Sequence, residues 1–374
     1  MSLALGESQA MIRKAAREFF AAECPPSVVR AMERDERGYP PHLWRQMAEM
    51  GWLGITLPGE YGGQEASFTD LLILLQEMGR AVVPGPFFST VVLAGHLILR
   101  AGSEAQKATL LPKLCRGDLL LSLALGEPGV DEELDWLTTT ATPERNAYRL
   151  TGVKLFVPDA HVADALMTVA TTGEGSRGLM VLLVTATSSG VTVLPLETSA
   201  LDRQFEVRFE NVRVPEESVV GTPGETWPAL EEMLARAAVA RCAEMVGAAQ
   251  KLLEMTVAHA KTRVQFGRPI GSFQAIQHHV ANLATAVETS ELLLYRAGWM
   301  IDRGLPFERA AAEAKAWANE SLTRAAALAH QVHGGLGFTA DYDLHLYSRR
   351  IKSWAHTHGS TRWAHERISR AMGI

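Results

Sequence analysis

Apolar positions along the chain change their period twice. Up to residue 118 and again after residue 225 they recur every three or four residues, which is the spacing of helices that bury one face. Between about 119 and 224 they fall in short runs rich in Val, Thr and Leu, bounded by Gly, Pro, Asp and Ser, which is the pattern of strands. The sequence therefore predicts helices, then a sheet, then helices again.

This order predicts an α+β fold with three domains. They are an N-terminal all-α domain over 1–118, a middle antiparallel β-barrel or sheet domain over 119–224, and a C-terminal four-helix bundle over 225–374. Short N-terminal helices are expected over 12–20, 43–50, 68–78 and 91–101. Strands are expected over 149–157, 165–171, 178–185, 190–196 and 205–214. Long helices are expected over 225–262, 272–303, 306–332 and 343–357.

Composition and charge narrow the class of protein. Hydrophobic residues make up 47% of the 374 residues and charged residues 21%, which is the balance of an ordinary globular protein. A net charge of −6 gives no basic surface for a phosphate backbone, so no nucleic-acid partner is expected. The first twenty residues lack the apolar core of a signal peptide, and no apolar run is long enough for a membrane helix. A cytoplasmic protein without membrane insertion is expected.

Local motifs for metals, disulfides and dinucleotides are weak. The three cysteines are odd in number and far apart, which suits a reducing compartment and predicts neither a disulfide framework nor a zinc cluster. His356 and His358 form an isolated HxH pair without a third ligand nearby, so no metal is expected. The glycines at 334, 335 and 337 follow a predicted helix and lack dinucleotide spacing, so locally they predict a helix stop.

A set of longer motifs runs in order along almost the whole chain. They are GWLGI at 51–55, PGEYGG at 58–63, LGEP at 125–128, GVKLF at 152–156, FENVRVP at 209–215, RVQFGRPI at 263–270, FQ at 273–274 and QVHGGLGF at 331–338. Together they resemble the acyl-CoA dehydrogenase family of flavoproteins. The resemblance implies a homo- or hetero-tetramer built around FAD. It also implies α,β-dehydrogenation of an acyl-CoA substrate, with an electron-transfer flavoprotein as the partner that collects the electrons.

The resemblance also implies which residues bind FAD. Seven residues would hold the adenosine diphosphate half, in the neighbouring subunit: Arg263, Gln265, Phe266, Gln274, Gln331, Gly334 and Gly335. A guanidinium suits a pyrophosphate, and glycines let backbone amides approach it. Gly126 and Phe156 would lie at the flavin ring, but there the chain departs from the family. Gly126 and Pro158 each stand where a threonine is usual, so two hydroxyl donors are missing.

The catalytic base of the family is also missing. Aligning residues 349–352 with the Arg-Asp-Ala-Lys segment of the family puts His358 at the position of the usual glutamate. A second group of family members has its glutamate at the position of Ala237. An imidazole with an ordinary pKa near ~6.5 is a candidate base, so His358 is the candidate catalytic residue. The other interpretation of His358 is a polar residue in a loop before the last helix.

Four functions remain open at this point. The first is a subunit that needs a glutamate-bearing partner. The missing glutamate and the missing hydroxyl donors are similar to those of the glutamate-lacking subunits in heteromeric acyl-CoA dehydrogenases of bacterial steroid side-chain degradation. The second is a self-sufficient enzyme that uses His358. The third is a flavin-dependent monooxygenase or nitro-compound oxidase on the same fold, where a missing glutamate is expected. The fourth is a non-catalytic structural member.

Overall fold

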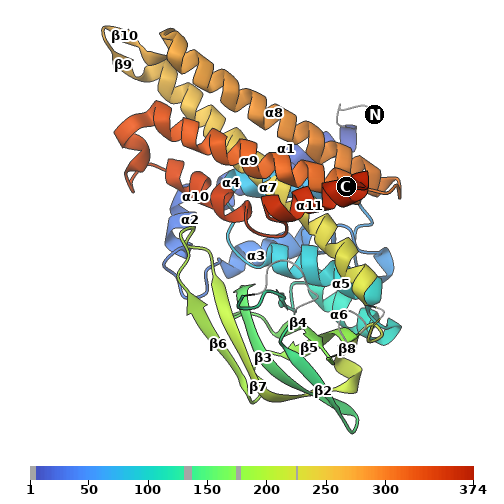
Figure 1. Ribbon diagram of the computed structural model, residues 1–374. Helices are drawn as coiled ribbons and strands as arrows, with labels where there is room; N and C mark the ends of the chain where they lie inside the picture. Colours follow the sequence, from blue (N-terminus) through green and yellow to red (C-terminus); the bar gives the residue numbers. More distant parts are fainter. Residues whose placement is uncertain (1–5, 130–136, 174–177, 225) are drawn as a thin grey trace. The chain divides into compact units, whose positions relative to one another are not determined.

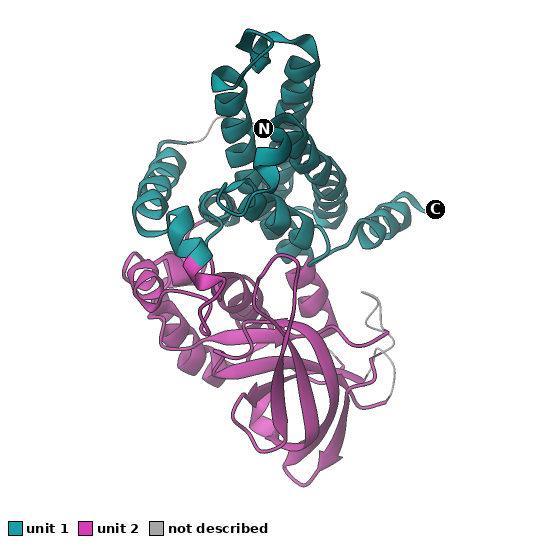
Figure 2. Cartoon of the chain, turned by 90° about the vertical axis from the view of Figure 1, so that its left-hand side faces the viewer, with its two compact units in different colours: residues 1–30, 67–83, 235–374 teal, residues 31–66, 84–234 magenta. Residues whose placement is uncertain are grey.

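The computed structural model describes residues 6–129, 137–173, 178–224 and 226–374 (Figure 1). The chain divides into two compact units, each assembled from segments that are distant in sequence (Figure 2). Unit 1 contains Met1–Arg30, Ser67–Val83 and Ala235–Ile374, and unit 2 contains Ala31–Ala66 and Pro84–Leu234. The predicted domain boundaries divide the chain differently and stay a prediction. Residues 1–5 of the first predicted domain and residue 225, where a predicted helix starts, lie outside the described residues.

Unit 2 contains the sheet and a group of short helices. The helical segments are α2 (Pro26–Met32), which ends in this unit, α3 (Pro41–Glu49), η1 (Trp52–Gly54), η2 (Gly59–Tyr61), η3 (Phe88–Gly95), α5 (His96–Ala101), α6 (Glu104–Cys115) and η6 (Glu216–Ser218). The strands are β1 (Leu121–Ala124), β2 (Thr140–Glu144), β3 (Ala147–Pro158), β4 (Ala165–Thr171), β5 (Leu179–Thr185), β6 (Val191–Leu196), β7 (Gln204–Pro215) and β8 (Val219–Val220).

The strands form one mixed sheet in the described part of the chain. Its order is β6-β7-β3-β2-β4-β5-β8, and β1 pairs with β4. Most neighbours are antiparallel as predicted, whereas β1 and β2 both run parallel to β4, so the sheet is mixed. Hydrophobic periodicity locates a strand and its buried face, but it carries no information on the direction of the neighbouring strand.

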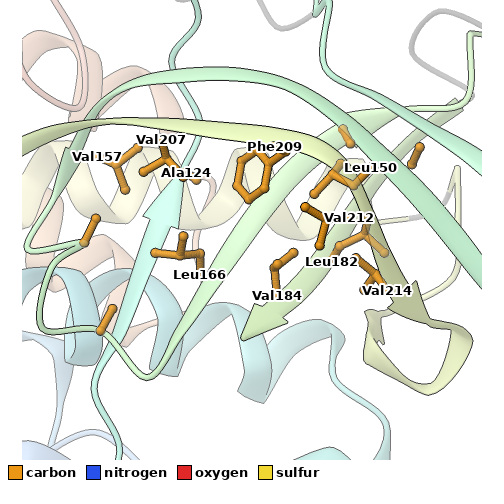
Figure 3. Packing of buried hydrophobic residues seen from close by; sticks show 14 of the residues in the cluster. Ala124, Leu150, Val157, Leu166, Leu182, Val184, Val207, Phe209, Val212 and Val214 are labelled. Atoms are coloured by element: carbon orange, nitrogen blue, oxygen red, sulfur yellow. The ribbon is translucent and has the colours of Figure 1, made fainter. Parts of the chain in front are cut away.

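The sheet encloses an apolar core (Figure 3). Along β7, Phe205, Val207 and Phe209 are buried while the residues between them face outward, which is the alternation expected of a strand with one buried face. Leu150 and Val157 of β3 are fully buried in the same core. This packing fixes β3, the strand that carries Phe156 and Pro158, in register against β7.

Unit 1 is a bundle of long helices. Its elements are α1 (Glu7–Glu23), α4 (Phe68–Ala81), most of α7 (Trp227–Thr262), α8 (Gln274–Asp302), α9 (Glu308–His333), α10 (Leu344–Trp354) and α11 (Thr361–Met372), with the short elements β9 (Val264–Gln265), β10 (Arg268–Pro269), η7 (Ile270–Ser272) and η8 (Gly334–Phe338). Helix α9 packs against α8, α10 and α11. Its buried face is mostly alanine, which lets neighbouring helices approach closely. The predicted order of helices, sheet and helices is confirmed.

Candidate functional site

A two-stranded hairpin of β9 and β10 follows α7 and carries two of the residues predicted to bind FAD, Gln265 and Phe266, while a third, Arg263, directly precedes it. In the turn between the strands Phe266 and Gly267 have φ values of 52° and 78°, so both are left-handed, as a two-residue type I′ turn requires. Phenylalanine rarely adopts this conformation, which costs roughly 1–2 kcal/mol. Phe266 contacts Phe273 edge-on, yet its side chain is 93% exposed. A strained, exposed aromatic residue at a hairpin tip is typical of a contact with a ligand or a partner.

Arg263 stands at the base of this hairpin with a fixed backbone. Its N–H donates to the His259 carbonyl at 2.8 Å, and its own carbonyl accepts from the Ile270 N–H at 2.8 Å. The side chain is exposed, and within the described ranges no carboxylate pairs with its guanidinium. Gln265 and Gln274 are exposed as well. The polar groups of this segment are therefore available to a ligand.

The turn after α9 has the open backbone predicted for a phosphate contact. Gly334 has φ 60° and ψ −140°, a conformation that is essentially restricted to glycine. A Cβ atom added at Gly334 or Gly335 would meet nothing within 4 Å, so the space beside this backbone is free. Gln331, three residues earlier, is exposed. An exposed guanidinium and an uncovered glycine turn fit the charge and shape of a nucleotide diphosphate. The assignment of these residues to FAD stays a prediction.

The residues predicted to contact the flavin ring lie together in unit 2. The Leu155 N–H donates to the Gly126 carbonyl at 2.8 Å, which joins the two predicted segments. The register of β3 against β7 shifts between Lys154 and Val157, and within this bulge Phe156 is left-handed, with φ 54°. A bulge re-aims a side chain, and Phe156 is 65% exposed. The aromatic face predicted for the ring is thus available.

Pro158 supplies no donor at this end of β3. Its carbonyl accepts a hydrogen bond from the Ser122 hydroxyl, and proline has no N–H to offer a ligand. Gly126 has no side chain. The family has a hydroxyl donor at each of these two positions, and neither Gly126 nor Pro158 supplies a donor in its place. The ring half therefore offers an aromatic face and lacks these two donors.

A buried ion pair holds this region, and sequence reasoning assigned it no role. Lys154 Nζ lies 2.7 Å from Glu127 Oε1 and 3.1 Å from the Leu125 carbonyl oxygen. Glu127 also accepts from the backbone N–H groups of Thr138 and Thr139. Burial raises the pKa of Glu127, but Lys154 and these hydrogen bonds outweigh it and lower the pKa to about 2. Burial lowers the pKa of Lys154 to about 8, so the pair is ionised at neutral pH. The signal in the sequence was a lysine within an apolar strand.

His358 lies in the loop between α10 and α11, in a left-handed conformation with φ 54°. Burial, and then the cations of Arg241 and Lys315, hold the pKa of His358 well below its ordinary value of 6.5. The ring is therefore neutral at pH 7, but its affinity for a proton is low. A general base needs a proton affinity matched to its task, so this environment does not favour His358 as the base for an α-proton.

The loop that carries His358 is tied to α9 by two buried polar side chains. Lys315 Nζ donates to Asn319 Oδ1 at 2.6 Å and to the Trp354 carbonyl at 2.8 Å. The Asn319 amide donates to the Gly359 carbonyl at 3.1 Å. Neither residue was predicted to have a role, although a Lys and an Asn four residues apart within an alanine-rich helix are a detectable signal.

The second position for a family glutamate offers no carboxylate either. Ala237 on α7 is fully buried. One and two turns later the same helix carries Arg241 and Glu244, which form a buried ion pair, and burial raises the pKa of Glu244. Within the described ranges no group of three or more His, Cys, Asp or Glu side chains is arranged to hold a metal ion. No helix in this part of the chain is long and apolar enough to cross a membrane.

Family models match three consecutive parts of the chain. Residues 6–118 match the acyl-CoA dehydrogenase N-terminal domain, residues 122–212 the middle domain, and residues 224–373 the C-terminal domain. The chain belongs to the acyl-CoA dehydrogenase family of FAD-dependent oxidoreductases. The predictions of the family, its fold, its enzyme class and its FAD cofactor are confirmed.

Similar proteins cover nearly the full length of the chain. An acyl-CoA dehydrogenase of Bacillus subtilis is 32% identical over 353 residues, which are 92% of this chain and 93% of the relative. The solved structure of the ChsE4-ChsE5 complex from Mycobacterium tuberculosis is 28% identical with a TM-score of 0.91, covering 100% of this chain and 99% of that one. A variant of the Tcur3481-Tcur3483 steroid ACAD is 31% identical with a TM-score of 0.89, covering 99% of both chains.

Proposed function

We propose that this chain is the base-lacking subunit of a heteromeric acyl-CoA dehydrogenase that acts on a bulky acyl-CoA, such as a steroid side-chain thioester. One observation carries the proposal: both positions of the family glutamate lack a carboxylate, while the exposed segments for the nucleotide half of FAD are intact. Ala237 is a buried methyl group, and His358 is a weak base beside two cations. One similar solved structure is named as the ChsE4-ChsE5 complex. Another is named as a variant of the Tcur3481-Tcur3483 steroid ACAD.

In this proposal the chain contributes binding and positioning rather than proton abstraction. Bound FAD supplies the acceptor for the hydride that leaves the β-carbon of the thioester. Arg263 would hold the pyrophosphate through its guanidinium, and the uncovered amides at Gly334 and Gly335 would hold it from the turn. Phe266 would offer its exposed ring to the cofactor. The carboxylate that takes the α-proton comes from the partner subunit, and an electron-transfer flavoprotein collects the electrons.

The test compares the chain alone with the chain co-expressed with a glutamate-bearing family member from the same source. The FAD content per chain and the oxidation of a steroid side-chain thioester by a ferrocenium acceptor are measured. We expect turnover only in the co-expressed complex, and fewer flavins than chains. We also expect His358→Ala to leave that turnover unchanged. One flavin per chain with ordinary turnover in the isolated chain would overturn the proposal.

The other candidate functions are distinct outcomes of the same measurements. Turnover of the isolated chain that is abolished by His358→Ala, with FAD still bound, identifies a self-sufficient enzyme. Oxygen consumption by reduced flavin without reaction with thioesters identifies a monooxygenase or oxidase. Absence of flavin even in complexes identifies a structural member.

A further inference from the structure

A pair of stacked imidazole rings joins the ends of α7 and α9. The ring centroids of His259 and His333 lie 4.5 Å apart, with an interplanar angle of 23°. His259 is one helical turn before Arg263 and accepts the hydrogen bond from its N–H. His333 is the last residue of α9 and immediately precedes Gly334. The stack therefore lies at the root of both segments that are proposed to bind the nucleotide.

Two polar contacts orient the His333 ring. Its Nδ1 lies 2.8 Å from the Ala329 carbonyl oxygen, and because a carbonyl can only accept, Nδ1 carries the proton. Its Nε2 lies 3.1 Å from the Tyr342 hydroxyl, which donates to a neutral ring and accepts from a protonated one. The Tyr342 ring also packs against the imidazole, with centroids 5.3 Å apart. Both ring nitrogens of His333 thus have a polar partner, which fixes the plane of the ring in the stack.

Burial and neighbouring cationic groups oppose a positive charge on the stack. Burial, His333 and Arg263 lower the pKa of His259. Burial also lowers the pKa of His333, and it outweighs the Ala329 and Met255 carbonyls, which favour the charged ring. The facing titratable and charged groups are His259 and Arg263 from the end of α7, His330 from α9, and Tyr342, Asp343 and His345 from the segment that begins α10. Asp343 forms an ion pair with Arg30. Within the described ranges no carboxylate lies in ion-pair contact with His259, His330 or His333.

We propose that the His259–His333 stack is a positioning element which holds Arg263 and the Gly334–Gly335 turn at one site, and which does so only while both rings are neutral. The proposal rests on the proposed nucleotide site and adds a structural requirement to it. Protonation of both rings puts two positive charges in contact beside Arg263, with the ring centroids 4.5 Å apart. The two segments then separate, and the site loses its preformed geometry.

The sign of the pH dependence follows from the direction of the pKa shifts. A histidine whose pKa is lower in the folded state binds fewer protons there than in the open state. Above its ordinary value near ~6.5 it has no effect, and as the pH falls below that value it increasingly favours the open state. FAD affinity should therefore be constant above about pH 7 and fall at lower pH, by roughly tenfold for each unit of pKa difference.

Two measurements test the inference on the purified complex, or on the chain if it binds FAD alone. Release of FAD is followed by flavin fluorescence between about pH 5.5 and about pH 8. Hydrogen exchange, corrected for the intrinsic effect of pH, is followed over residues 255–270 and 326–342. His259→Phe keeps a stacked ring that cannot be protonated, whereas His333→Ala removes the stack. His42→Phe, at an exposed histidine of unit 2, is the control.

We expect the wild type and His42→Phe to lose FAD affinity roughly tenfold between about pH 7.5 and about pH 5.5, and to exchange faster at residues 331–338 over the same range. In His259→Phe, FAD affinity and the exchange rate should each change less than twofold over this pH range. In His333→Ala, FAD affinity should be low at every pH. A His259→Phe variant that follows the wild-type pH profile overturns the inference. If no FAD binds at pH 7.5 in any preparation, the proposed nucleotide site fails, and the exchange measurement alone decides whether the stack opens.

Discussion

The Lys154 ammonium and the Glu127 carboxylate meet at 2.7 Å with both side chains fully withdrawn from solvent. Lys154 is on β3, and its ammonium contacts Glu127. The next residue on the strand, Leu155, donates its N–H to the carbonyl of Gly126, the residue before Glu127. Of the two predicted flavin-ring residues, Gly126 directly precedes Glu127, and Phe156 is two residues after Lys154. The pair couples the stability of the sheet to the geometry of the ring site.

Removing the ammonium should destabilise the protein strongly. Lys154→Met leaves the Glu127 carboxylate buried without its counter-charge, which costs about 3–5 kcal/mol. The matched control is Arg149→Met on the same strand, where a partly exposed pair with Glu144 is lost at a cost of about 0–1 kcal/mol. Urea denaturation measures the free energy of unfolding of both variants. Equal losses in the two variants would contradict the role of the buried pair.

The same pair predicts how stability depends on acid. The pKa of Glu127 is about 2 in the folded protein, below its ordinary value of 4.5, so the folded state binds fewer protons between these values. Its contribution to the free energy of unfolding is complete above pH 4.5 and is lost as the pH falls toward 2. Urea denaturation at several pH values measures this slope. The double variant Glu127→Gln and Lys154→Met should have a shallower slope, and an unchanged slope would refute the assignment.

Replacing Phe156 by glycine should change stability and FAD affinity in opposite directions. Glycine tolerates the left-handed conformation, so Phe156→Gly should raise the free energy of unfolding by about 1 kcal/mol, while removing the aromatic face proposed for the flavin. Leu201→Gly is the control, since Leu201 is also left-handed and 45% exposed. It should stabilise the protein with FAD affinity unchanged. Thermal unfolding and flavin titration measure the two effects, and unchanged FAD binding in Phe156→Gly would argue against the ring site.

The thiols of Cys24, Cys115 and Cys242 are free and buried and should be inert in the folded protein. Burial raises the pKa of Cys24 to about 12 and that of Cys242 to about 11, and it also raises the pKa of Cys115. Little thiolate is available near neutral pH. Ellman's reagent should therefore react with these cysteines only after denaturation, and then with all three. Rapid reaction of the native protein would show that one of these sites opens to solvent.

Strands and helices were predictable where a single period was uninterrupted. The predicted strand 165–171 coincides with β4, because a run rich in apolar residues and threonine lies between Asp164 and Gly173. The four residues of β1 and the two of β8 are too short to show a period. The β9–β10 hairpin was missed because its turn places a phenylalanine, rather than Asn or Asp, before glycine.

The candidate site was predictable only as far as its motifs. Arg263, Phe266 and Gly334 were predicted from a resemblance and are exposed as a binding role requires, although their roles stay predictions. The side chains that fix these segments were not predicted. Contacts such as His259 with His333, or Lys315 with the Trp354 carbonyl, join residues far apart in sequence, and only the packing of the helices brings them together.

At Gly334 the chirality of the residue, and not the space around it, decides which amino acid fits. With φ 60° and ψ −140° it occupies the mirror image of ordinary extended backbone, while an L-Cβ would meet no atom within 4 Å. Crowding therefore excludes no other residue here, but the chirality of the encoded amino acids disfavours all of them. D-alanine introduced by chemical ligation would adopt this backbone without strain, whereas L-alanine would reorganise the turn.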